Sequence, residues 1–142
     1  MTATTQPVDA ARILAPGVLI GAVAGVFAGV FMLVGGAPPS WAVTAGALLA
    51  LPLAVAGAGC ALLRWRGVLS SGHFAPMALY WAIAFPLVRL VQEVGTRLVL
   101  GDTFALPPQP WAFLAYQALI GVGFAIGFVW VQERLVRGGA RR

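Results

Sequence analysis

The sequence predicts an all-α, polytopic membrane protein with four transmembrane helices, and two observations support this fold class. First, 61% of the 142 residues are hydrophobic and only 9% are charged, whereas soluble domains carry about 25% charged residues. Second, four apolar segments are long enough to cross ~30 Å of hydrocarbon at ~1.5 Å per residue. So little charge cannot cover a water-soluble domain of this size. Most of the protein surface must therefore face lipid or other protein.

The four transmembrane helices are predicted near 13–35, 42–63, 76–100 and 111–132. Three segments of different composition separate them. GGAPPS (35–40) and ALPPQP (105–110) are proline-rich turns, and RWRGVLSSGH (64–73) is a polar, basic loop. Residues 13–132 are therefore expected to form one four-helix transmembrane domain.

The positions of the arginines predict the orientation of the chain. If the chain crosses the membrane four times, one side carries Arg12, Arg64, Arg66, Arg134, Arg137, Arg141 and Arg142. Basic residues are enriched on the cytoplasmic side of membrane proteins. We therefore predict a cytoplasmic tail at 1–12, a cytoplasmic loop at 64–73 and a basic cytoplasmic tail at 133–142. The use of arginine without lysine, together with abundant Ala, Gly and Val, is typical of a GC-rich bacterial genome, which predicts the bacterial cytoplasmic (inner) membrane.

Few residues of this chain could support catalysis or bind a metal. Cys60 and His73 each occur once, which excludes an intrachain disulfide, a cysteine-based metal site and a haem held by two histidines. The apolar segments hold only two acidic residues, Glu93 and Glu133, and the chain lacks hydrolase, metalloprotease and nucleotide-binding motifs. The arginines form no stripe of the kind that binds nucleic acid. We therefore predict no enzymatic activity, no cofactor, no metal and no nucleic-acid partner.

The third apolar segment carries a polar cluster, which consists of Arg89, Gln92, Glu93, Thr96 and Arg97. An Arg or an acidic residue at the centre of a membrane helix costs roughly 2.5 to 3.5 kcal/mol even on the mildest scale. At ~100° per residue the five side chains fall within an arc of about 140°. The spacing of four residues predicts that Glu93 pairs with both arginines. The cluster must therefore face protein or a watery cavity.

Two interpretations of the polar cluster remain open at the sequence level. The cluster could lock the third helix onto the fourth, where Gln117 is an available polar partner. Alternatively, it could be a functional site, because ionisable residues at membrane depth commonly mark one. Near the outer surface, Arg97 could form a small anion site with Asp102 and Thr103, although snorkelling to the interface is the commoner role of such an arginine.

Pro86 lies on the same side of the third helix as the polar cluster. Proline lacks a backbone N–H, so the carbonyl of Ala82 loses its helical hydrogen bond and a kink is expected there. Helical side chains lean toward the N-terminus of the helix. Arg89 is therefore predicted to reach toward the freed carbonyl.

Rows of small residues predict how the helices pack. In lipid, close approach of backbones through glycine and alanine supplies much of the attraction between helices. The short turn at 35–40 holds the first two helices together, so their rows are expected to pair; the alternative is that the first row binds another subunit or a second copy of the chain. The predicted packing residues are Gly17, Gly21, Gly25 and Gly29 on the first helix, Gly46, Ala50, Ala54 and Ala58 on the second, and Gly123 and Gly127, with Gly121 and Ala125, on the fourth.

Two further patterns lead to expectations about the surface. Trp65, Tyr80, Trp81, Trp111 and Trp130 are predicted to be anchors at the membrane interface. At an offset of 70 residues, the second and fourth segments share Pro38, Trp41, Ala42, Ala45, Leu49, Gly57 and Arg64 with Pro108, Trp111, Ala112, Ala115, Leu119, Gly127 and Arg134. Whether this is a true repeat stays open, and shared hairpin chemistry is the simpler explanation.

These observations lead to a functional expectation with two alternatives. The favoured function is a small accessory or assembly subunit of a larger bacterial membrane complex, surrounded by lipid and by other membrane subunits or a second copy of itself. The main alternative is a homodimeric transporter or channel in which Arg89, Glu93 and Arg97 line the path of a solute or proton. A weaker alternative is recognition of an anionic lipid through the arginines.

Overall fold

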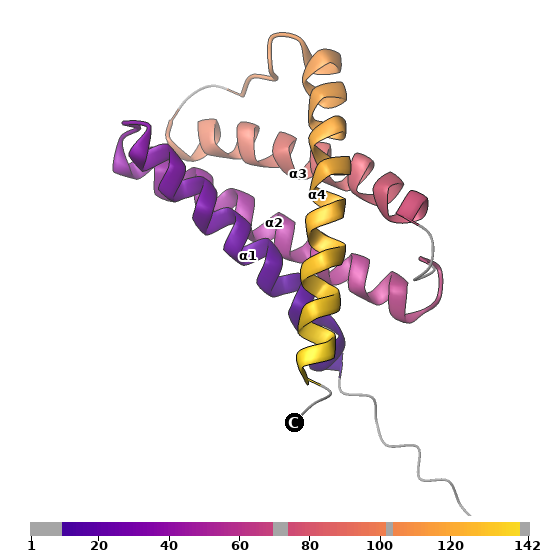
Figure 1. Cartoon of the computed structure of the whole chain (residues 1–142). Coiled ribbons are helices and arrows are strands. Elements are labelled where there is room, and N and C mark those ends of the chain that lie inside the picture. The colour runs from indigo at the N-terminus through magenta and orange to yellow at the C-terminus, as the bar shows by residue number, and fades with distance from the viewer. Residues whose placement is uncertain (1–9, 70–73, 102–103, 140–142) are drawn as a thin grey trace, which may run out of the picture.

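The computed structural model describes residues 10–69, 74–101 and 104–139, of which the side chains of 132 and 135–139 are not described. Its elements are the helices α1 (Ala10–Val34), α2 (Pro39–Trp65), α3 (Phe74–Val99) and α4 (Pro110–Gly139) (Figure 1). All four are long and apolar enough to cross a membrane. The predicted all-helical fold with four helices of membrane-spanning length is therefore confirmed.

The ends of the helices follow from proline and glycine. Pro39 and Pro110 are the first residues of α2 and α4, where a missing backbone N–H costs nothing because that N–H would have no helical partner. Gly36 and Gly101 follow α1 and α3 with φ angles of 84° and 91°, a conformation in which glycine commonly ends a helix.

All four helices are longer than the spans predicted from hydropathy, and two of them extend into the predicted tails. α1 begins at Ala10, within the segment predicted as a tail, and α4 continues to Gly139, into the predicted basic tail. The segment VQERLVR after Trp130 contains no glycine or proline, so nothing in it stops the helix before Gly138. The remaining parts of the predicted tails, 1–9 and 140–142, lie outside the described residues.

α1 and α2 form a tight hairpin along the two rows of small residues. A Cβ atom added to Gly21 would lie 2.5 Å from the carbonyl carbon of Leu53, and one added to Gly25 would lie 2.5 Å from Cα of Ala50. Gly17 lies against the backbone of Gly57. The sequence predicted Ala58 as the packing residue on this turn of the second helix, and Gly57 takes that place. Backbones this close leave no room for a side chain, which explains the glycine at each contact.

α3 and α4 contact each other through aromatic side chains. Trp81 is fully buried, and its ring lies 4.7 Å from that of Phe124 and 4.9 Å from that of Phe128, measured between centroids. On the α4 side, Gly121 makes room for the backbone of Trp81, and a Cβ there would lie 2.9 Å from that of Phe85. The expectation that Trp81 is an interfacial anchor is therefore wrong: its ring is the centre of a helix–helix contact.

The outward face of α4 corrects a second expectation. A Cβ atom added to Gly123 or Gly127 would meet nothing within 4 Å, so neither glycine packs against another described helix. The physical reason is helical periodicity: α4 faces α3 with Gln117, Gly121 and Ala125, and residues two positions further on point away from that face. α4 crosses α3 and makes only a few contacts with α1 (Figure 1).

α3 is tied to α2 by contacts spread along its length. The hydroxyl of Tyr80 donates a hydrogen bond of 2.6 Å to the carbonyl oxygen of Ala56. The thiol of Cys60 lies 3.1 Å from the sulfur of Met77. Tyr80 is thus half-buried, and its hydroxyl is bound to α2. The result is an arrangement in which α2 lies between α1 and α3, and α4 packs mainly on α3.

Candidate functional site

The polar cluster of α3 faces the α1–α2 hairpin and lines a cavity of about 160 Å³. At ~30 Å³ for each water of the liquid, this volume has room for about five waters. We call this space the polar cavity. It is lined by Met32 of α1, Trp41 and Ala45 of α2, and Arg89, Gln92, Glu93, Thr96 and Arg97 of α3.

Position along α3 determines the depth of the polar cavity. Arg97 lies two residues before the end of α3, whereas Arg89 lies eight residues earlier, or about 12 Å deeper at 1.5 Å per residue. Met32 is near the end of α1 and Trp41 near the start of α2. The cavity therefore occupies the half of the four-helix region that contains the α1–α2 turn, away from the 64–69 segment.

Gln92 fixes α3 against α2 and has one polar atom without a hydrogen-bond partner among the described residues. Its side chain is 5% exposed, and Nε2 donates a hydrogen bond of 3.0 Å to the carbonyl oxygen of Ala45. This hydrogen bond determines which end of the amide faces α2. The other atom, Oε1, is buried and has no hydrogen-bond partner among the described residues. A buried acceptor without a donor is unfavourable by ~1–3 kcal/mol.

Thr96 and Gln92 are joined along the same helix face. Thr96 is 5% exposed. Its hydroxyl donates a hydrogen bond of 2.7 Å to the backbone carbonyl oxygen of Gln92. The hydroxyl hydrogen of Thr96 is therefore bonded within its own helix. The oxygen accepts no hydrogen bond from the described residues.

The ion pair in the cavity joins only two of the three charged groups. Nε and Nη2 of Arg97 donate to Oε1 of Glu93 at 3.2 and 3.0 Å. Within the described part of the chain, the Arg89 guanidinium makes no hydrogen bond or ion pair. The expectation that Glu93 bridges both arginines is therefore wrong. The Glu93 carboxylate is turned toward Arg97 through Oε1, and no hydrogen bond or ion pair joins it to Arg89 among the described residues.

Arg89 has a sheltered position and makes no hydrogen bond or ion pair with the described residues. It is partly buried and lines the polar cavity. No hydrogen bond joins it to the carbonyl of Ala82 among the described contacts, so the predicted reach toward Ala82 is not observed. Pro86 is buried inside α3, which continues as one helix from Phe74 to Val99.

Gln117 lies apart from the polar cavity. It is 6% exposed on α4, and its Oε1 has no hydrogen-bond partner among the described residues. It is not part of the cavity lining. The polar contact of α3 is made with α2, through Gln92, rather than with α4. Asp102 and Thr103, the other residues considered for an outer anion site, lie outside the described residues.

The sequence reasoning missed the other half of the cavity wall. Met32, Trp41 and Ala45 carry no charge and gave no sign of facing the polar cluster. Trp41 and Ala45 stood out in the sequence only as positions that the second segment shares with the fourth. The pairing of α2 with α3 brings Trp41 and Ala45 to Arg89 and Gln92, and Met32 joins them through the α1–α2 hairpin.

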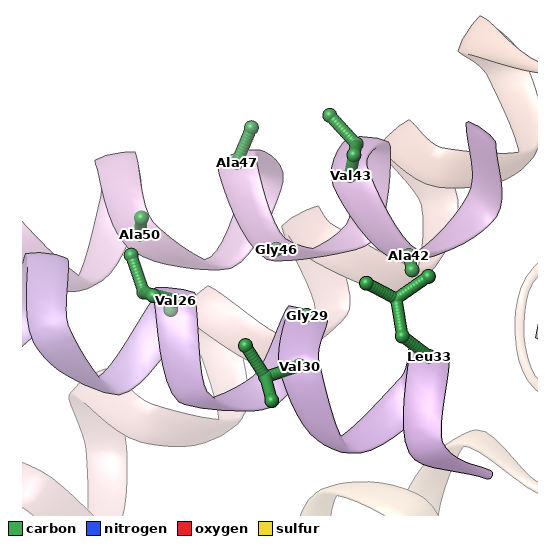
Figure 2. A pocket seen from close by; sticks show the side chains of 10 residues that line it. Val26, Gly29, Val30, Leu33, Ala42, Val43, Gly46, Ala47 and Ala50 are labelled. Carbon is green, nitrogen blue, oxygen red and sulfur yellow. The ribbon is translucent and has the colours of Figure 1, made fainter. Parts of the chain in front are cut away.

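A second, apolar groove lies between the same ends of α1 and α2 (Figure 2). Its volume is about 320 Å³, and Gly29 and Gly46 form its floor where the helices come together. Val26, Val30 and Leu33 of α1 lie along one side, opposite the α2 residues Ala42, Val43, Ala47 and Ala50 (Figure 2). Its walls are hydrocarbon, so the groove suits an apolar chain and offers no chemistry.

The described residues contain no group of three or more His, Cys, Asp or Glu side chains that could hold a metal ion. What the structure defines is a multi-pass arrangement of four candidate transmembrane helices around a small polar cavity. Comparison with protein-family models, with curated proteins and with solved structures gives no match.

Proposed function

We propose that this protein is a small accessory or assembly subunit of a larger membrane complex in the bacterial cytoplasmic membrane, with both termini in the cytoplasm. The observation that supports this proposal is the outward face of α4. Gly123 and Gly127 lie on it one turn apart with open space above them. Glycine lowers helix stability relative to larger residues, and on a lipid-facing surface it gains nothing in return.

The positions shared between α2 and α4 show what such a face is suited for. On α2, Ala45, Leu49 and Gly57 are buried against the neighbouring helices. At the matching positions of α4, Ala115, Leu119 and Gly127 are all exposed, and Leu119 is 72% exposed.

The same pattern of small residues and leucine is therefore buried on α2 and exposed on α4. Lipid tails are as apolar as leucine, so transmembrane helices associate where small residues allow close contact. We take the partner to be a transmembrane helix of another membrane protein, seated on this face of α4.

Replacement of the two glycines tests the proposal. The double variant Gly123→Leu/Gly127→Leu fills the open face and is expected to lose copurification of partner subunits after extraction in a mild detergent. The control is Ala15→Leu/Ala75→Leu, which enlarges two exposed residues on α1 and α3 and is expected to retain the partners. A wild-type protein that purifies as a monomer or homodimer, without other subunits, would contradict the proposal.

A second candidate function is favoured by the polar cavity. A homodimeric transporter or channel could use Arg89, Glu93 and Arg97 on the path of a solute or proton, and all three line the cavity. Flux into liposomes separates the candidates. Flux that disappears in Glu93→Gln or Arg89→Ala, while both variants keep their helical content, supports transport; the absence of flux for inorganic anions and protons in the wild type argues against it.

A further inference from the structure

We propose that the polar cavity binds a monoanionic phosphate group that carries, or lies beside, a hydroxyl group. The proposal concerns the polar cavity alone and does not depend on association through α4. It follows from three properties of the cavity: its charge, its unfilled donors and acceptors, and its size.

The charge of the cavity favours a single negative charge. Arg89 and Arg97 contribute two positive charges and Glu93 one negative charge, which leaves an excess of one positive charge. The Glu93–Arg97 pair is satisfied internally at 3.0 Å. Arg89 has no such partner among the described residues, so the excess charge resides on its guanidinium. A charged group in an apolar surrounding needs an opposite charge or water.

The geometry of a guanidinium favours an oxyanion as that partner. Arginine presents a planar set of N–H donors that matches the oxygens of a carboxylate or phosphate, often with two hydrogen bonds at once. Chloride is a single atom and has no pair of oxygens to match the N–H donors of the guanidinium. Arg89 is one of the residues that line the cavity, and its guanidinium makes no hydrogen bond with described residues, so no described residue occupies its donors.

Gln92 distinguishes between the oxyanions. Its Nε2 is committed to Ala45, so Oε1 is the atom without a partner. Oε1 only accepts hydrogen bonds, and the Thr96 oxygen has spent its hydrogen on the backbone of Gln92. Gln92 and Thr96 therefore offer the cavity acceptors and no free donor. A carboxylate or sulfate brings acceptors alone, so it cannot itself donate to Oε1. A phosphate with an O–H supplies both the acceptor for Arg89 and the donor for Gln92.

The size and depth of the cavity are consistent with a phosphate group. A phosphate occupies less space than the ~five waters that fit in 160 Å³. Two sources provide the required chemistry: inorganic phosphate, and the headgroup of a phospholipid such as phosphatidylglycerol, whose phosphodiester is a monoanion beside glycerol hydroxyls. Arg97, at the end of α3, lies where a lipid headgroup could enter.

Binding of matched ligands to the purified protein tests the proposal. Inorganic phosphate and sulfate are titrated by calorimetry into the full-length protein in a neutral, lipid-free detergent. In parallel, native mass spectrometry measures retention of phosphatidylglycerol and of phosphatidylcholine, whose headgroup has no hydroxyl. In the first arm phosphate is expected to bind more tightly than sulfate; in the second, phosphatidylglycerol is expected to be retained over phosphatidylcholine. A positive result in either arm supports the proposal and identifies the source.

Variants of the cavity residues test whether the ligand binds in the polar cavity. A hydrogen bond to a charged group contributes ~1.5–3 kcal/mol, so Arg89→Gln should weaken binding by about tenfold or more. Gln92→Leu removes the acceptor and should abolish the preference for phosphate over sulfate, or for phosphatidylglycerol over phosphatidylcholine. The control Arg134→Gln, on an exposed arginine stacked 4.4 Å from the Trp130 ring, should bind as the wild type does.

Circular dichroism and size-exclusion chromatography establish that each variant is folded before its affinity is compared. If Arg89→Gln proves unfolded, Arg89→Lys keeps the charge but loses the fork and should still reduce affinity. The proposal is overturned if neither phosphate nor phosphatidylglycerol binds. It is equally overturned if binding is unchanged in folded Arg89 variants, or if sulfate and phosphatidylcholine bind as well as their hydroxyl-bearing counterparts.

Discussion

The contact between α1 and α2 leads to a sharp prediction for Gly21→Ala. A Cβ at position 21 would lie 2.5 Å from the carbonyl carbon of Leu53 and 2.6 Å from Cα of Ala54, against ordinary contacts of 3.4–4 Å. These neighbours are backbone atoms and cannot rotate away. The two helices must therefore separate locally by roughly 1 Å, and a gap of that size forfeits a quarter to a half of each affected van der Waals contact. Overpacking of this kind costs about 1–3 kcal/mol, and we expect the upper end of that range.

Two other glycine-to-alanine variants provide an internal scale. At Gly29 an added Cβ meets one carbonyl oxygen at 3.1 Å and its next neighbour at 3.6 Å, so a small shift accommodates it. At Gly123 an added Cβ meets nothing within 4 Å. The free energy of unfolding, measured in detergent micelles by titration with a denaturing detergent, should therefore fall most for Gly21→Ala, less for Gly29→Ala and not at all for Gly123→Ala. Equal stabilities of the Gly21 and Gly123 variants would refute this description of the hairpin.

Three further predictions concern the core. Trp81→Ala removes a fully buried ring and should lower the free energy of unfolding by about 3–5 kcal/mol, whereas Trp111→Ala, at a side chain that is 82% exposed, should change it little; equal effects would contradict the assignment of Trp81 to the core. Tyr80→Phe removes the 2.6 Å hydrogen bond to Ala56 and should cost about 0.6 kcal/mol, the average for such bonds in membranes. Cys60 is fully buried, so a water-soluble maleimide should label it only after denaturation; rapid labelling of the folded protein would show that the α2–α3 contact is open.

The sequence was sufficient for the fold class and for the hairpin. Glycines spaced four residues apart on one helix, and small residues on the next, lie on single faces by helical geometry alone. A short turn then leaves few ways to place the two faces other than against each other. The structure brings Gly21 to Ala54 and Gly25 to Ala50 in this manner.

The α3–α4 contact could not be derived from the sequence because its signals were ambiguous. Trp81 follows Tyr80 near the start of an apolar segment, which is where an interfacial anchor also lies. Its burial depends on Phe124 and Phe128 of a helix that is distant in sequence. Glycines at 121, 123 and 127 looked equivalent, and only the direction from which α3 approaches α4 separates the packed Gly121 from the two exposed positions.

The α3 residues of the candidate site could be predicted from the sequence, whereas the contribution of α2 could not. Five polar residues on one face of α3 required shelter, and the energetic cost of charge in hydrocarbon was enough to single them out. Which helix shelters them depends on α2, whose contribution is a backbone carbonyl at Ala45 and an uncharged wall. A carbonyl is present at every position, so no residue type could have indicated this partner for Gln92.

Oxygen accessibility along α3 tests the central claim, that the polar face of this helix is turned toward α2 and sheltered from lipid. Spin labels are placed singly along α3 in a Cys60→Ala background, and collisions with oxygen dissolved in the bilayer are measured by electron paramagnetic resonance. Gln92 and Thr96, each 5% exposed, should give minima, and Leu87, Val91 and Leu98, each more than half exposed, should give maxima. Maxima at 92 and 96 would show that the polar face is turned to the lipid and would contradict the claim.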